Sequence, residues 1–438
     1  MPLFIVICGI LLLLLLIAKG KLNAFISFII VSLLVGVAEG MDVLAVVDSI
    51  QKGLGKTLGD LVMILGFGAM LGKLVADSGA AQRITTKMVE KFGKNNIQWA
   101  VVVTGFIVGI PMFYSVGFVI LVPLIFTVAT ATGLPLIYVG LPMLASLSVT
   151  HGYLPPHPAP TGIAVMFDAD LGKTLLYGVL VAIPAIIVAG PLFTRTIKNI
   201  EATPLKEFLN PKVMADDEMP SITVSILTAL LPVILIGFAA LISFLLPDGN
   251  VLKQLANVVG NPVIAMLISV LVALYTLGLA RGRKMGDIMN SVSQAVASIT
   301  MVLLIIAGAG ALKEVLVDSG VSDYIGSLLK DSTISPLILA WLIATAIRVC
   351  VGSATVAGLT AAGIVLPLLA GTEVSPELMV LAIGSGSLML SHVNDGGFWL
   401  FKEYFNLSVK DTLKTWTVME TTVGVMGLIG VLVLDVLI

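Results

Sequence analysis

Three histidines are the side chains of this sequence best suited to proton chemistry, and all three lie in two short segments rich in polar or helix-breaking residues. His151 and His157 belong to a segment with four prolines, and His392 is closely followed by Asn394 and Asp395. An imidazole titrates near neutral pH, so each histidine is a candidate for binding a proton. We expect His157 and Asp395 to couple a proton to the function of the protein.

Arg348 is a basic residue inside a long apolar run, where an ionisable side chain is a functional candidate by default. Hydroxyl and amide side chains lie at the same interruptions of the apolar pattern, and together they suit a small, anionic, hydroxyl-rich ligand. The predicted ligand-binding residues are Tyr114, Ser115, His151, Thr161, Arg348, Ser353, Thr355, His392 and Asn394. Structural roles are the alternative: Arg348 could pair with a carboxylate, the histidines could satisfy backbone groups, and Asp395 could cap a helix.

These side chains must be positioned by membrane-spanning helices, because the composition excludes a water-soluble fold. Of the 438 residues, 58% are hydrophobic and only 11% are charged, whereas a soluble domain carries about 25% charged residues. Several apolar segments have the length of a membrane span. They are residues 2–18, 172–194, 221–246, 291–317 and 415–438.

The motifs that the sequence lacks argue against an enzyme and against a nucleotide-driven pump. It contains neither a GxxxxGK[ST] phosphate-binding loop nor an HExxH zinc motif, and it has no paired aspartate-rich motifs. Its two cysteines, Cys8 and Cys350, lie in apolar runs without metal-ligand spacing. We therefore expect no cofactor, no metal ion and no nucleic-acid partner, and a carrier driven by an ion gradient.

An internal repeat divides the chain into two halves. The sequence resembles itself at a shift of 241 residues, which separates Asp77 from Asp318 together with the residues around each of them. The halves are residues 1–197 and 221–438, joined by the polar linker 198–220.

The distribution of charge predicts that the two halves have opposite orientations in the membrane. The loop after Asp77 is rich in lysine and arginine, whereas the equivalent loop after Asp318 is not. Short basic loops stay in the cytoplasm, so the two loops should lie on opposite sides. The same rule places Lys19, Lys21 and the linker 198–220 inside and the N-terminus outside. Inverted repeats of this kind are a signature of secondary transporters.

Two elements of each half do not read as ordinary spans. Residues 98–132 and 335–371 are too long for one crossing and are interrupted in the middle, which favours a re-entrant hairpin in each half. Residues 134–168 and 376–402 each read as a helix broken at polar residues, and irregular backbone at membrane depth must be buried in protein or line a wet cavity. The predicted fold is an all-α polytopic membrane protein of two inverted repeats, each with five transmembrane helices and one hairpin.

This arrangement predicts where a ligand binds and which part moves. The site should lie between the two hairpin tips and the two broken helices, where helix N-termini offer unpaired N–H groups to a carboxylate. Residues 98–168 and 335–401 would form the moving part of an elevator-type transporter, and the other helices the scaffold and a homodimer surface.

Three motifs resemble those of the gluconate permease family of proton symporters. They are His-Gly-Tyr-Leu-Pro-Pro-His-Pro-Ala-Pro-Thr at 151–161, Gly-Ile-Pro-Met-Phe-Tyr-Ser at 109–115 and Ser-His-Val-Asn-Asp-Gly-Gly-Phe-Trp at 391–399. The resemblance covers the whole chain. It implies an ion-transporter-superfamily architecture in the lipid of the bacterial inner membrane, and uptake of gluconate or a related sugar acid together with a proton.

Other functions remain open at this point. Members of the family also transport other hexonates such as idonate or fructuronate, as well as glycerate and D-serine, and the motifs do not distinguish these substrates. A sodium-coupled carboxylate carrier of the same fold is the nearest alternative, but its paired Ser-Asn-Thr motifs are absent from 150–161 and 391–397. A channel and a membrane-embedded enzyme are more distant alternatives.

Overall fold

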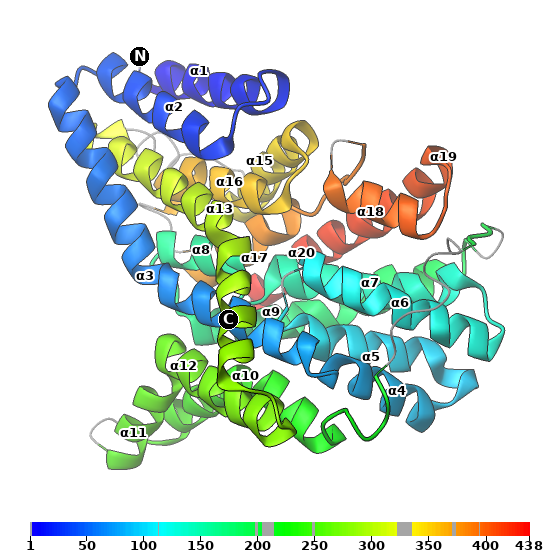
Figure 1. Cartoon of the computed structure of the whole chain (residues 1–438). Helices are drawn as coiled ribbons and strands as arrows, with labels where there is room; N and C mark the ends of the chain where they lie inside the picture. Colours follow the sequence, from blue (N-terminus) through cyan, green and yellow to red (C-terminus); the bar gives the residue numbers. More distant parts are fainter. Residues whose placement is uncertain are drawn as a thin grey trace.

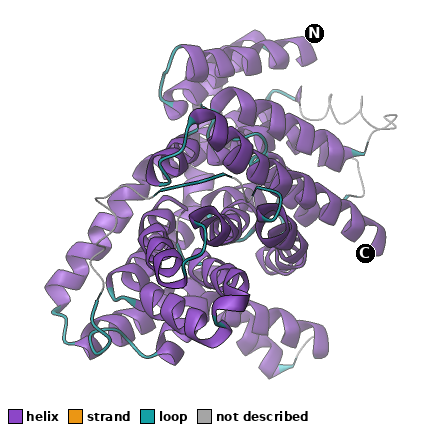
Figure 2. Cartoon of the chain, turned by 90° about the vertical axis from the view of Figure 1, so that its right-hand side faces the viewer, coloured by secondary structure: helices purple, strands orange, loops and turns teal. Residues whose placement is uncertain are grey.

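The protein is helical throughout the part that the structure describes, as Figure 2 shows. The computed structural model describes residues 2–112, 114–197, 200–203, 214–247, 250–321, 335–369, 374–393 and 395–438. Five described helices are long and apolar enough to cross a membrane: Leu171–Leu192, Ile222–Ala239, Pro262–Arg281, Met285–Asp318 and Val409–Leu437. A sixth candidate, bent by 42°, consists of Val43–Gly59 and Val62–Asp77. The chain is therefore an all-helical membrane protein with several apolar spans, as its composition predicts.

Two long helices that pack along each other, α3 and α13, form one side of the molecule (Figure 1). Shorter helices pack on this pair or on one another. The helices of this group are α1 (Pro2–Leu14), α2 (Ala24–Ala38), α3 (Val43–Asp77), α10 (Ile222–Leu245), α11 (Val251–Gly260), α12 (Pro262–Ala273) and α13 (Met285–Asp318). A Cβ atom at Gly53 of α3 would lie 2.4 Å from the carbonyl oxygen of Gly310 of α13. The close approach of the pair therefore requires glycine at this crossing.

Two hydrogen bonds show that α3 and α13 run antiparallel. Ser49 near the start of α3 donates to the carboxylate of Asp318 at the end of α13, with an O···O distance of 2.7 Å. Ser291 near the start of α13 donates over the same distance to Asp77 at the end of α3. At each end of the pair, a serine near the start of one helix thus donates to an aspartate at the end of the other helix.

The first predicted hairpin region consists of α5 (Ile97–Gly109) and α6 (Tyr114–Thr132), which both pack on α7 (Leu136–Tyr153). The chain leaves the helical path after Tyr153, where prolines remove backbone donors, and resumes it in α8 (Pro158–Met166). These helices lie between α4 (Ala80–Phe92) and α9 (Leu171–Ile187) in the chain, and α9 continues as a π-helical turn to Leu192. The four residues 154–157 therefore separate α7 from α8.

The second half contains a similar series of helices. Helices α15 (Pro336–Val351) and α16 (Ala354–Leu369) are separated only by Gly352 and Ser353. They are followed by α17 (Pro376–Gly386), α18 (Gly396–Tyr404), α19 (Val409–Thr412) and α20 (Val418–Leu437). Gly352 has φ of +82° and accordingly ends α15 in the left-handed conformation that favours glycine.

The two broken helices, α7 and α17, meet at their interrupted ends. A Cβ atom at Gly384 of α17 would lie 2.4 Å from the carbonyl oxygen of Gly152 in the last turn of α7. The segments that follow, 154–157 and 387–393, are therefore brought close to the same level of the molecule. This crossing positions the polar residues of both breaks around one region.

Candidate functional site

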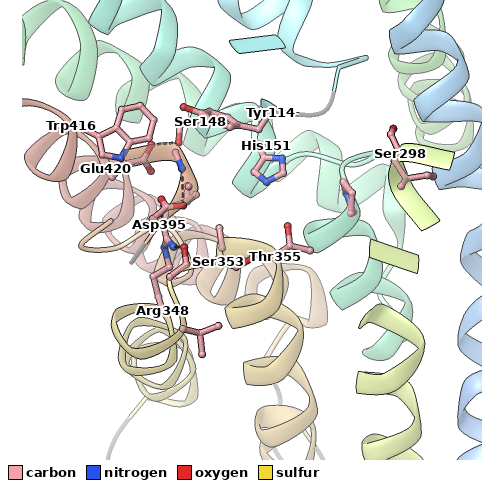
Figure 3. Close-up of a pocket in the computed structure, with 18 residues that line it drawn as sticks. Tyr114, Ser148, His151, Ser298, Arg348, Ser353, Thr355, Asp395, Trp416 and Glu420 are labelled. Carbon is pink, nitrogen blue, oxygen red and sulfur yellow. Dashed lines mark hydrogen bonds and ion pairs between the residues drawn. The ribbon is translucent and has the colours of Figure 1, made fainter. Parts of the chain in front are cut away.

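A cavity of about 440 Å³ lies where the two breaks meet the tip of each hairpin region (Figure 3). Its volume is within the range of small-molecule sites in proteins. The polar side chains that line it are Tyr114, Ser148, His151, Ser298, Arg348, Ser353, Thr355, Asp395, Trp416 and Glu420. Ser298 belongs to α13, so this long helix bounds the cavity on one side.

The N-termini of four helices contribute to this cavity. The first residues of these helices, which line it, are Tyr114 of α6, Pro158 of α8, Ala354 of α16 and Gly396 of α18. A helix N-terminus carries unpaired backbone N–H groups and the positive end of the helix dipole. Asp395 caps the end of α18, and prolines occupy two of the first three positions of α8, so the N-termini of α6 and α16 are the ones that favour a small anion in this space.

Arg348, in the last turn of α15, is the buried cation of the cavity. Its guanidinium donates to the carbonyl oxygen of Gly352 and forms an ion pair with Asp395. The remaining nitrogen, Nε, is buried and has no hydrogen-bond partner among the described residues. An unsatisfied buried donor is costly, so a ligand that accepts a hydrogen bond from Nε would be bound favourably.

Asp395 is fully engaged as a carboxylate. Its Oδ2 accepts from Arg348 and from the hydroxyl of Ser391, and its Oδ1 accepts from the backbone N–H of Gly397 at 3.0 Å. The last bond caps the N-terminus of α18. Both alternatives considered for these residues are thus present in the structure: Asp395 caps a helix, and Arg348 pairs with a carboxylate.

The three histidines have different surroundings. His157 Nε2 lies 2.9 Å from the carbonyl oxygen of Gly109, the last residue of α5, and His392 Nε2 lies 3.1 Å from that of Val349 in α15. A carbonyl only accepts, so Nε2 carries the proton in both rings. Each of these histidines joins a break to the end of the first helix of the hairpin region in its own half.

His151 is the histidine that lines the cavity. Its Nδ1 lies 3.4 Å from Nδ1 of His157, and its ring centroid lies 5.7 Å from that of Tyr114. In the neutral form of His157 the proton is on Nε2, so Nδ1 accepts and His151 Nδ1 is the donor in this pair. The Nε2 atom of a neutral His151 is then an acceptor.

The structure brings together six of the residues that the sequence predicts for the site. They are Tyr114, His151, Arg348, Ser353, Thr355 and Asp395. Three others lie outside the cavity lining: Thr161 is buried in α8, and His157 and His392 make the backbone contacts described above. The side chain of Ser115 and the whole of Asn394 lie outside the described residues.

Sequence reasoning missed Glu420, Ser148, Ser298 and Trp416, which also line the cavity. Ser148 and Trp416 look like ordinary residues of a spanning helix, and no sequence signal marks them. Glu420 did carry a signal, because it is one of only two acidic residues in the apolar run 415–438, the other being Asp435 near the end of the run, and an acidic residue within a membrane span is expensive.

Comparisons with known proteins extend over the full length of the chain. Residues 1–437 match the family described as GntP family permease. The chain is 53% identical to a high-affinity gluconate transporter of Escherichia coli K12, with 100% of each protein covered. It is 52% identical to the Gnt-II system L-idonate transporter of the same organism, with 99% of each covered. A gluconate permease of Bacillus subtilis 168 is 48% identical, with 100% of each covered.

Two solved structures share the fold at low sequence identity. MtrF of Neisseria gonorrhoeae superposes with a TM-score of 0.64 at 15% identity, covering 94% of this chain and 93% of MtrF. The YdaH transporter of Alcanivorax borkumensis gives a TM-score of 0.60 at 18% identity, covering 94% and 96%. The chain belongs to the GntP family of permeases, a bacterial family of multi-pass membrane transporters, and is not an enzyme.

Proposed function

We propose that this protein takes up gluconate or a closely related hexonate such as idonate, together with a proton, across the bacterial inner membrane. The observation that carries the proposal is the cavity between the two breaks, which is lined by Arg348, whose buried Nε has no partner among the described residues, and by residues at four helix N-termini. This arrangement suits one carboxylate. The names of the similar proteins, gluconate and idonate transporters, supply the chemical class.

The cavity also suits the polyhydroxyl chain of a sugar acid. The carboxylate would accept from Arg348 Nε and from the N-terminus of α16, where Ser353 and Thr355 lie. The hydroxyl of Tyr114 has no partner among the described residues and, with His151, is available to the hydroxyls of the ligand. The predicted contacts of Ser115, Thr161, His392 and Asn394, and the predicted proton-coupling roles of Asp395 and His157, stay predictions.

The proposed architecture is an elevator-type homodimer of two inverted repeats. The mirrored bonds Ser49–Asp318 and Ser291–Asp77 support the inversion, because they relate equivalent helices in reversed order. Ser298 of α13 lines the cavity, which supports a binding site between the fixed scaffold and the moving part of the transporter. Single cysteines test the orientation: we expect Glu39→Cys to react with a membrane-impermeant thiol reagent in intact cells, and Lys284→Cys to react only after permeabilisation. The opposite pattern would contradict the proposal.

Uptake of labelled gluconate into proteoliposomes with an inward proton gradient tests the function. We expect saturable uptake that collapses with a protonophore and is independent of sodium, and competition by unlabelled idonate. Glycerate, D-serine and succinate serve as the comparison set and distinguish the alternative substrates. Uptake that requires sodium would favour the sodium-coupled alternative, and no gradient-driven uptake of any of these compounds would contradict the proposal.

A further inference from the structure

Glu420 is a buried carboxyl group of the cavity that the proposed binding of the sugar acid does not use. It lies in the first turn of α20, is 2% exposed and lines the cavity next to Trp416 (Figure 3). Its Oε1 accepts a hydrogen bond from the hydroxyl of Ser148 on α7. Its Oε2 is buried without a hydrogen-bond partner among the described residues.

The charged and titratable groups around Glu420 do not neutralise it. Tyr114, His151, Arg348 and Asp395 line the same cavity, and Tyr153 on α7 donates its hydroxyl to the carbonyl oxygen of Val423, one turn further along α20. Arg348 is the cation among these groups, and its ion pair is with Asp395. No ion pair of Glu420 occurs within the described part of the chain.

A carboxylate at this position would therefore be buried without a cationic partner, which is unfavourable. A proton on Oε2 removes the charge and turns the unpartnered oxygen into an O–H donor. The side chain of Glu420 lines the cavity, so a hydroxyl or carboxylate oxygen of a ligand that packs against this side chain could accept from that donor. The position of Glu420 thus allows the same group to bind a proton and to contact the ligand.

Asp395 differs from Glu420 in each of these respects. It accepts from a guanidinium, a hydroxyl and a backbone N–H, and all three donors favour the ionised form. Protonation of Asp395 would disrupt the ion pair that holds α15 to the start of α18. The two acids of the cavity are therefore suited to different tasks, one to a permanent charge and the other to a proton that is gained and lost.

We propose that Glu420 is the proton-binding residue of the transport cycle, and that the protonated carboxyl donates a hydrogen bond to the bound sugar acid. This inference depends on the proposed proton-coupled uptake. In the cycle, the proton joins Oε2 from the side of higher proton concentration, the ligand binds against the O–H, and both leave on the other side. Ser148 holds Oε1 throughout and connects Glu420 to the first broken helix.

Glu420→Gln tests the inference, because the amide keeps the shape and a donor but cannot exchange a proton. Glu314→Gln is the matched control: Glu314 is also a buried glutamate, but it lies on α13, where it pairs with Lys52 away from the cavity. Each variant is reconstituted and assayed for accumulation of labelled gluconate driven by a proton gradient, for gluconate counterflow without a gradient, and for gluconate-induced alkalinisation of the external medium.

We expect E420Q to retain counterflow and to lose both accumulation and alkalinisation, whereas wild type and E314Q retain all three. A gradient of one pH unit can sustain roughly tenfold accumulation if one proton accompanies each anion, so the loss is readily measured. Gradient-driven accumulation by E420Q at the wild-type level would overturn the inference. Absence of gradient-driven uptake in wild type would instead overturn the proposed function, so the two failures are distinguishable.

A second variant covers the case in which E420Q binds no gluconate. Glu420→Asp keeps a titratable carboxyl group but moves it, so we expect coupled uptake with a displaced pH profile. An unchanged pH profile would contradict the inference. Loss of gluconate binding together with a large drop in melting temperature in both variants would assign Glu420 a purely structural role and would overturn the inference as well.

Discussion

Arg348 and Asp395 form an ion pair that connects the end of α15 to the start of α18, 47 residues further along the chain. The pair uses one terminal nitrogen of the guanidinium, and the carbonyl oxygen of Gly352 uses the other. Nε is left for a ligand. The same side chain therefore holds two elements of the cavity together and offers a donor to whatever binds there.

Replacement of Arg348 by lysine should separate these two roles. Lysine can keep the ion pair with Asp395, but it lacks the planar fork that provides Nε as an additional donor. We expect Arg348→Lys to keep most of the thermal stability in detergent and to lower the affinity for gluconate by roughly 10- to 100-fold, since a hydrogen bond to a charged group contributes about 1.5–3 kcal/mol. Unchanged affinity in a binding titration would show that Nε does not contact the ligand.

The charge-neutral double variant R348Q/D395N tests the structural part of this pair. Arg348→Gln alone leaves Asp395 without its cation and should be destabilising, by about 3 kcal/mol if the site behaves as a buried pair. The second substitution removes the unpaired charge, so the double variant should melt at a higher temperature than R348Q. Gluconate uptake should be absent in both variants, because both lack Arg348. Additive loss of stability in the double variant would contradict the ion-pair account.

His157 and His392 should respond to substitution mainly through stability. Alanine at either position leaves a carbonyl at the end of a hairpin helix without its donor, which costs about 1–3 kcal/mol. We expect both alanine variants to melt earlier in detergent. Glutamine retains a side-chain N–H and should recover part of the loss.

The glutamine variant of His157 also decides whether this histidine handles the proton. Glutamine does not titrate, so gradient-driven uptake by a stable H157Q protein would argue against a proton-coupling role. Loss of gradient-driven uptake with unchanged counterflow would support the role that the sequence predicts for His157.

Gly384 should be intolerant of even a methyl group. A Cβ atom there would lie 2.4 Å from the backbone oxygen of Gly152, so α7 and α17 would have to move apart. Crowding of this kind typically costs about 1–3 kcal/mol, and Gly384→Ala should lower both the melting temperature and gluconate uptake. Gly66→Ala is the control, because a Cβ atom at Gly66 of α3 meets no other atom within 4 Å. Equal effects of the two substitutions would contradict the crossing.

The hydroxyls of Ser49 and Ser291 should each contribute to the stability of the long-helix pair. Their bonds to Asp318 and Asp77 lie at opposite ends of α3 and α13, and each should be worth about 1 kcal/mol. We expect Ser49→Ala and Ser291→Ala to lower the melting temperature by similar amounts, and their effects to add in the double variant because the sites share no partner. A large effect of one and none of the other would contradict the mirrored arrangement.

The helical membrane fold could be predicted because apolar length is a strong signal in lipid. Interruptions of the helices also left a signal in the sequence, which places them near Gly109–Gly117 and Arg348–Gly358. In the structure, α5 ends at Gly109 and α6 begins at Tyr114, and α15 ends at Val351 and α16 begins at Ala354. The inverted orientation of the halves rests on the distribution of basic loops and stays a prediction.

The candidate site was only partly predictable, because sequence position does not show which side of a helix faces a cavity. Residues beside a break, such as Arg348, Ser353 and Thr355, were found because a break forces nearby polar groups toward protein or water. Ser148 and Glu420 lie within regular helices and join the cavity only through the packing of α7 and α20. Their contact spans 272 residues of sequence, which no local pattern reveals.

A structure of the protein with bound gluconate tests the central claim most directly. The account predicts ligand density in the cavity between the two breaks, with the carboxylate within hydrogen-bond distance of Arg348 Nε and the N-terminus of α16, and with a ligand oxygen facing Glu420. Density for gluconate elsewhere in the protein, or a carboxylate that points away from Arg348, would contradict it.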